Sequence, residues 1–137
     1  MSEAEAANLG EREQANVAIV RGFIETMGKL DPEIRYHRYM ADNCRIRWES
    51  ASDSQVQWEE SKVIVGPAAA AAGARKYVDL DLIYEPKIED IYATGPVVVA
   101  RRTDTLIKPG APERKATAIG VFIVKDGKIA EWVDYLG

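Results

Sequence analysis

The sequence predicts an α+β fold in which helices come first and a sheet follows. In the N-terminal part, apolar residues recur at the i, i+3, i+4, i+7 spacing of an amphipathic helix, at Val20, Phe23, Ile24 and Met27. Strand-like alternation and turn signals dominate the remainder, including the hairpin signal Asp126-Gly127. Helices followed by strands are typical of an antiparallel sheet covered by helices on one face.

Three helices are expected. The first runs from Glu11 to about Gly28, after a polar leader over residues 1–10 that we expect to be flexible. The second begins at Asp31-Pro32 and continues to about Ala41, because Asp is a favoured N-cap and Pro suits the first helical position. The third follows Gly66-Pro67 through the alanine run and ends near Tyr77.

Strands are expected over residues 44–49, 55–65, 80–92, 97–106, 115–124 and 129–135. Turn-forming segments separate them, at residues 50–54, 94–96, 108–113 and 125–128. The sequence contains no internal repeat and no interdomain linker. Residues 11–137 are therefore predicted to form one domain.

Composition excludes several classes of function. The chain has 137 residues, 47% of them apolar, and a net charge of −4, which argues against nucleic acid because phosphates demand a clustered basic surface. A single cysteine, Cys44, precludes an internal disulfide. With His37 as the one histidine, the usual zinc and iron ligand sets are also excluded, and no Asp-rich or Gly-rich loop indicates magnesium or phosphate binding. We therefore expect no metal and no cofactor.

The N-terminus and the hydropathy pattern bear on location. Residues 1–7 are acidic and lack the basic and apolar regions of a signal peptide. No apolar run approaches the length of a membrane span. We expect a cytoplasmic protein with no membrane partner.

The candidate chemistry lies on two strands. Arg102 and Asp104 are two residues apart and therefore share a face of the strand 97–106 with apolar neighbours. A charge on a buried face loses several kcal/mol of hydration, so an adjacent opposite charge is needed there. Asp134 shares a face with Trp132 in the last strand, and the two-residue turn places it opposite about Ile119. If these strands are neighbours, the three charged side chains can meet.

Two interpretations remain open from the residues alone. Two carboxylates bridged by one arginine form an acid–base site, because like charges raise the pKa of one carboxyl and leave the other ionised. Alternatively, the charges lie on a solvated face of the sheet, as strand charges commonly do.

The C-terminal motifs resemble limonene-1,2-epoxide hydrolase and the SnoaL-like polyketide cyclases of the nuclear-transport-factor-2-like superfamily. That family carries an Arg-x-Asp in a long strand and a Trp-x-Asp-Tyr in the last one, matched here by residues 102–104 and 132–135. The likeness is strong over the last 40 residues or so and extends to the order of elements before them. It implies a cone-shaped, curved antiparallel or mixed sheet covered by three N-terminal helices and enclosing a hydrophobic pocket.

The resemblance also implies roles. Asp134 would be the general base, Arg102 the bridge and Asp104 the acid, with no metal. In the hydrolase a Tyr-x-Asn also holds the reacting water, but Ile46 and Trp48 stand at those positions here. Isoleucine has no polar atom and tryptophan offers one donor. Compared with the family, this chain therefore retains the residues that transfer protons and lacks the residues that hold the water.

Further residues are candidates for substrate binding: Trp48, Ile46, Tyr36, His37 and Trp132. Trp58 and Tyr39 are additional aromatic residues that would suit an aromatic substrate, although core packing explains such residues as well. Arg45 and Arg47 are predicted to be surface residues at a homodimer interface.

The leading hypothesis is a cofactor-free lyase or isomerase acting on a small hydrophobic oxygenated molecule, aromatic, terpenoid or polyketide-like. The reaction would be an elimination, or a retro-aldol step of the kind by which a relative releases formaldehyde from an aromatic diol. An epoxide hydrolase, with Tyr36 or His37 replacing the missing water ligands, is the alternative. A non-catalytic small-molecule-binding dimer is the third possibility, because this fold hosts many functions.

Overall fold

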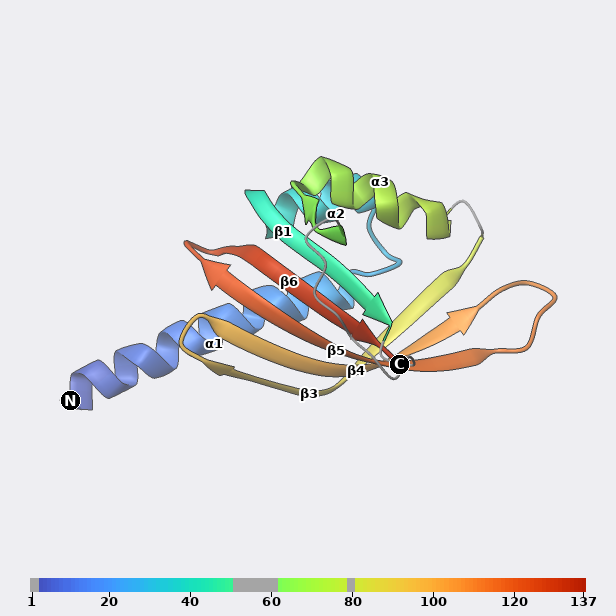
Figure 1. Cartoon of the computed structure of the whole chain (residues 1–137). Coiled ribbons are helices and arrows are strands. Elements are labelled where there is room, and N and C mark those ends of the chain that lie inside the picture. Colours follow the sequence, from blue (N-terminus) through green and yellow to red (C-terminus); the bar gives the residue numbers. More distant parts are fainter. Residues whose placement is uncertain (1–2, 51–61, 79–80) are drawn as a thin grey trace.

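The structure is a computed structural model that describes residues 3–50, 62–78 and 81–137. Within these ranges it has three helices and six strands (Figure 1). The helices are α1 (Glu3–Glu25), α2 (Pro32–Tyr39) and α3 (Pro67–Val78). The strands are β1 (Met40–Ser50), β2 (Ile64–Val65), β3 (Ile83–Thr94), β4 (Val97–Ile107), β5 (Arg114–Lys125) and β6 (Lys128–Leu136).

The strands form one mixed sheet in the order β2-β1-β6-β5-β4-β3. All neighbouring pairs are antiparallel except β1 and β6, which run parallel. The last strand of the chain is thus inserted between β1 and β5. This insertion brings the C-terminal Trp-x-Asp-Tyr segment to the middle of the sheet.

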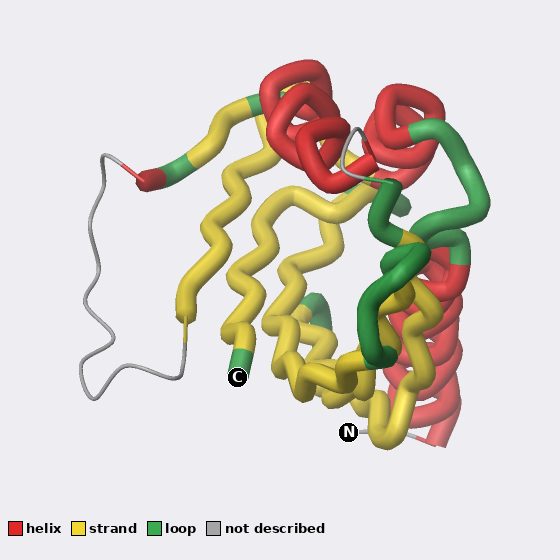
Figure 2. The backbone as a smooth tube through the Cα atoms, turned by 90° about the vertical axis from the view of Figure 1, so that its right-hand side faces the viewer, coloured by secondary structure: helices red, strands yellow, loops and turns green. Residues whose placement is uncertain are grey.

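The sheet is strongly curved and does not close. Figure 2 shows the strands curling around an open side, along which the helices lie. This is the α+β arrangement expected from the sequence, a curved mixed sheet with three covering helices.

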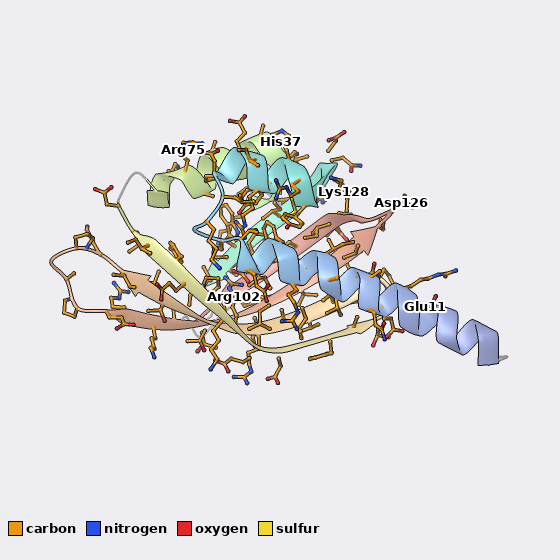
Figure 3. The ribbon with its side chains drawn as sticks, turned by 180° about the vertical axis from the view of Figure 1, so that it is seen from behind. Glu11, His37, Arg75, Arg102, Asp126 and Lys128 are labelled. Carbon is orange, nitrogen blue, oxygen red and sulfur yellow. The ribbon has the colours of Figure 1, made fainter. Side chains whose placement is uncertain are left out.

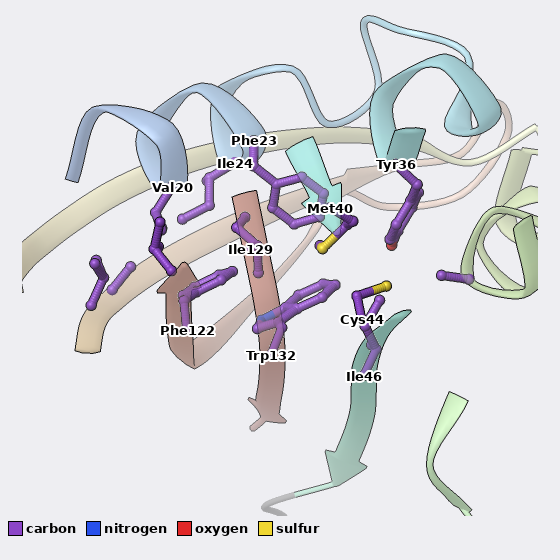
Figure 4. Close-up of a cluster of buried hydrophobic side chains, with 14 of the residues drawn as sticks. Val20, Phe23, Ile24, Tyr36, Met40, Cys44, Ile46, Phe122, Ile129 and Trp132 are labelled. Atoms are coloured by element: carbon purple, nitrogen blue, oxygen red, sulfur yellow. The ribbon is translucent and has the colours of Figure 1, made fainter. Parts of the chain in front are cut away.

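The hydrophobic core lies between α1 and the concave face of the sheet (Figure 4). Phe23 of α1 meets Trp132 of β6 edge to face, with ring centroids 5.1 Å apart, and Trp132 stacks on Phe122 of β5 at 5.5 Å. Each buried ring of this kind stabilises the fold by about 1.5–3 kcal/mol. Cys44 is fully buried in the same cluster, as a small apolar residue would be.

The predicted boundaries differ from the observed ones in a few places. Helix α1 begins at Glu3, where the sequence indicated a leader, and α2 gives way to β1 at Met40. Only Ile64 and Val65 of the strand predicted over residues 55–65 are paired in the described part, and Trp58 lies outside it. The Asp126-Gly127 turn is confirmed, with positive φ at both residues.

Arg47 corrects one prediction. It lies on the face opposite Ile46, as expected, but it is 3% exposed and its Nε stands 2.9 Å from Oε1 of Glu49, which is also buried. Alternation along the strand assigned it correctly to a face. The adjacent Glu49 carboxylate compensates part of the cost of burying the guanidinium there. Arg45 is exposed, as predicted.

Candidate active site

Strand β4 presents two charged side chains to the concave face. Its buried positions alternate through Val98, Ala100, Arg102 and Asp104, and both charged residues are at most 3% exposed. The side-chain period of a strand explains the shared face. The interpretation of these charges as a solvated surface is therefore wrong.

A β-bulge in the β5–β6 hairpin positions Asp134. Val124 pairs with Ile129, but Ile123 pairs with Glu131, so one extra residue enters β6. Both Ile129 and Trp132 are thereby turned toward the core, although they are three positions apart and not two or four. The insertion also places Asp134 opposite Gly120, whereas a simple two-residue turn predicted that it would lie opposite about Ile119.

Small residues on β5 let Arg102 reach across that strand. Ala118 lies opposite Arg102, and Gly120 lies opposite Asp134. A Cβ at Gly120 would stand 2.6 Å from the Phe122 ring, so glycine is also required for the close packing of that ring. The Arg102 side chain passes over these two small residues, and its guanidinium reaches β6.

The guanidinium binds both carboxylates. Nη1 and Nη2 of Arg102 donate to Oδ1 and Oδ2 of Asp134 at 2.8 and 2.7 Å, and Nε donates to the Asp104 carboxylate at 3.0 Å. We call these three residues the Asp–Arg–Asp cluster. The bidentate geometry fixes the plane of the Asp134 carboxylate, as paired parallel hydrogen bonds do.

Burial and pairing act in opposite directions on Arg102. Burial alone lowers its pKa, but the hydrogen bonds and charge of Asp134, with those of Asp104, outweigh that effect and raise the pKa above its ordinary value. Arg102 therefore stays charged at any working pH. With both carboxylates ionised, the Asp–Arg–Asp cluster carries a net charge of −1.

The cluster lines a cavity of about 350 Å³ between the sheet and the α1–α2 region. Figure 3 shows Arg102 in the interior, between α1 and the strands. Much of the cavity wall is apolar, formed by Met27, Leu30, Trp48, Leu82, Trp132 and Leu136. A largely apolar cavity with a few convergent polar groups is the usual form of a small-molecule site.

Three of the five predicted binding residues line this cavity, namely Trp48, Tyr36 and Trp132. Ile46 does not, because its side chain is fully buried in the core. His37 does not either: it is exposed on the outer side of α2, where its Nδ1 stands 2.8 Å from the carbonyl oxygen of Glu33 (Figure 3). Tyr36 is 2% exposed, and burial raises the pKa of its phenol.

Arg35 is a cavity residue that sequence reasoning missed. It is 5% exposed, its Nε donates to the Phe23 carbonyl at 2.8 Å, and its guanidinium lies 3.8 Å above the Phe23 ring. Burial lowers its pKa to about 10. Arginine on a short polar helix normally faces solvent, and only the position of α1 against α2 reveals this one as buried.

The described residues also bear on metal binding and on membrane insertion. No group of three or more His, Cys, Asp or Glu side chains there is arranged to hold a metal ion. None of the helices in that part of the chain has the length and apolar character to cross a membrane.

Solved structures place the chain in the nuclear-transport-factor-2-like class of folds. An NTF2-like protein from Burkholderia xenovorans LB400 is 21% identical, with 91% of each chain covered and a TM-score of 0.63. A protein assigned as a SnoaL-like polyketide cyclase from Jannaschia sp. CCS1 is 18% identical, with 91% of this chain and 87% of that chain covered and a TM-score of 0.71.

The family follows from the sequence match. The model of the limonene-1,2-epoxide hydrolase catalytic domain matches residues 14–137, and the chain belongs to that family. An LEH-like epoxide hydrolase from M. tuberculosis is 25% identical, with 91% of this chain and 84% of that chain covered and a TM-score of 0.69. No curated protein matches the chain. The resemblance inferred from the C-terminal motifs is thereby confirmed.

Proposed function

We propose that this protein is a cofactor-independent acid–base enzyme, a lyase or isomerase that acts on a small hydrophobic oxygenated molecule. One observation carries the proposal: the buried Asp–Arg–Asp cluster opens onto a largely apolar cavity. Three charged groups away from water cost several kcal/mol of hydration each, and such clusters are concentrated at functional sites. The family and its neighbours, which include epoxide hydrolases and proteins assigned as cyclases and isomerases, agree with an enzyme.

The proposed reaction transfers protons within the bound substrate. Asp134, held in plane by Arg102, takes a proton from a carbon or hydroxyl of the substrate, and Asp104, which enters the reaction in its protonated form, gives that proton to the oxygen that leaves. In an elimination, the electron pair of the broken C–H bond forms the double bond and the C–O pair departs with the Asp104 proton. Proton exchange with water then restores the two carboxyl groups.

Trp48 favours this proton transfer over delivery of water. It is the direct neighbour of Asp134 across the β1–β6 pairing and lines the cavity. In limonene-1,2-epoxide hydrolase an asparagine holds the water at that position and a tyrosine stands two residues before it. Here the tyrosine is replaced by Ile46, which is buried in the core and has no polar atom. Trp48 and Trp132 form a wall suited to an aromatic or polycyclic substrate.

The test is a substrate screen followed by substitution. Aromatic 1,3-diols, β-hydroxy ketones and terpene epoxides are incubated with the enzyme, and absorbance change and released aldehyde are recorded. With a substrate in hand, Asp134→Asn and Asp104→Asn should each reduce kcat by about 10²–10⁴-fold. His37→Ala is the matched control and should leave kcat unchanged, because His37 lies outside the cavity. Unchanged turnover in Asp134→Asn would reject the catalytic assignment and leave a ligand carrier.

An epoxide hydrolase is the second candidate. It is favoured by the family model and by Tyr36, whose buried phenol lines the cavity and can hold a water in place of the missing ligands. Reaction in ¹⁸O-labelled water separates the two candidates. A hydrolase incorporates one labelled oxygen into the diol product, whereas an elimination or isomerisation leaves the product unlabelled.

A further inference from the structure

The cavity contains a second buried guanidinium that the Asp–Arg–Asp cluster does not use. Arg35 reaches the cavity from α2, whereas the cluster lies on the sheet. It is 5% exposed, and its Nη2 has no hydrogen-bond partner among the residues that the structure describes. Its Nε donates to the Phe23 carbonyl, and a side-chain hydrogen bond also links Arg35 with the neutral phenol of Tyr36.

Arg35 is poorly compensated for so deep a position. A buried charge is normally paired with an opposite charge, because removal from water costs several kcal/mol. Here the partners are uncharged: a carbonyl, the Tyr36 side chain, and the rings of Phe23 and Tyr36, whose centroids lie 3.8 and 5.4 Å from the guanidinium carbon. The nearby Arg102 repels it, and both carboxylates of the cluster are already bound to Arg102. The lowered pKa of Arg35 reflects the same burial and repulsion.

We propose that Arg35 anchors a carboxylate of the substrate, so that the enzyme acts on a hydrophobic, oxygenated carboxylic acid. This inference rests on the proposed function and adds that the substrate carries a negative charge. A carboxylate supplies the counter-charge and the hydrogen-bond acceptor that Arg35 lacks. Its apolar body then lies along Trp48 and Trp132, toward the Asp–Arg–Asp cluster.

Binding of two matched probes tests the anchor directly. 3-Phenylpropanoate and 3-phenylpropanamide have nearly the same shape and differ in charge, and their affinities are measured by tryptophan fluorescence and calorimetry. A hydrogen bond to a charged group is worth about 1.5–3 kcal/mol, so the wild-type protein should bind the carboxylate at least about tenfold more tightly than the amide.

Three variants assign that preference to a residue. Arg35→Met keeps the length of the side chain without its charge and should bind the two probes equally. Lys29→Ala removes the exposed cation that also lines the cavity and should keep the preference. Arg35→Lys retains the positive charge and should keep part of the preference for the carboxylate. A merely structural Arg35 would alter both affinities together and leave their ratio unchanged.

The outcomes separate this proposal from the catalytic one. Equal binding of both probes by the wild-type protein overturns the anchor, whether or not Arg35→Met folds. So does a preference that survives in Arg35→Met or disappears in Lys29→Ala. The catalytic proposal is judged by turnover of Asp134→Asn, and this variant should still prefer the carboxylate because Arg35 is intact.

Discussion

Removing the bridge of the Asp–Arg–Asp cluster should strongly destabilise the protein. In Arg102→Met the apolar side chain fits the buried space, but Asp104 and Asp134 are left buried without a counter-charge, at 3% and 2% exposure. Three hydrogen-bonded contacts to the guanidinium nitrogens are lost at the same time. Both carboxylates are almost fully buried, so little hydration replaces the lost contacts.

The magnitude follows from the number of charges left unpaired. Breaking one buried ion pair by removing a partner costs about 3–5 kcal/mol. Two carboxylates lose one shared partner here, and the effects do not add fully, so we expect a loss of about 5 kcal/mol. For an m-value of about 2 kcal/mol/M in urea, the unfolding midpoint should fall by about 2.5 M.

Urea unfolding followed by tryptophan fluorescence measures this loss. The matched control is the triple variant Asp104→Leu, Arg102→Met, Asp134→Leu, which removes all three charges together. Replacement of a whole buried ion pair or triad by apolar residues is often neutral or stabilising, so its midpoint should lie near that of the wild type or above it. A midpoint shift below about 0.5 M in Arg102→Met would refute the reasoning, as would a triple variant less stable than the single one.

Three further predictions concern other parts of the molecule. Gly120→Ala should lower the free energy of unfolding by about 1–3 kcal/mol in urea titrations, because its Cβ collides with the Phe122 ring. In Asp31→Asn, the melting temperature at pH 7 should be lower than that of the wild type, and this difference should disappear in acid below the native pKa of Asp31. The hydrogen bond from Arg75 lowers the pKa of Asp31, so this stabilisation is present above pH 3.8 and is lost as pH falls through the native pKa. We also expect a homodimer through the outer sheet face, where Ile119 is 43% exposed, and Ile119→Lys should shift the mass measured by light scattering toward the monomer.

Most of the site could be predicted because strand alternation is a local property. The period of two placed Arg102 and Asp104 on one face without knowledge of the neighbouring strands. The exact partner of Asp134 could not be predicted in the same way. The bulge near Ile129 arises because Ile129 and Trp132 both pack inward, and that preference depends on the core as a whole.

The burial of two arginines could not be predicted from local sequence patterns. Arg47 follows the strand period but is buried beside Glu49, whose carboxylate lies 2.9 Å from its Nε. Arg35 follows a polar helical pattern but is buried because α1 places a carbonyl and the ring of Phe23 beside it. In both cases the charge is tolerated inside because of a contact with another residue, and no single segment of sequence reveals that contact.

In the proposed enzyme, the sheet carries the residues that transfer protons and the helices carry the residue that selects the substrate. The Asp–Arg–Asp cluster is held by the hydrogen-bonded register of β4, β5 and β6, where a shift of one residue would turn its side chains to the other face. Arg35 is held by packing between two helices, and a substitution at this contact leaves the strand register unchanged. Substitution at Arg35 should therefore change which molecules bind while the cluster keeps its geometry. Substitution in the cluster should stop the reaction while the charge preference of the cavity persists.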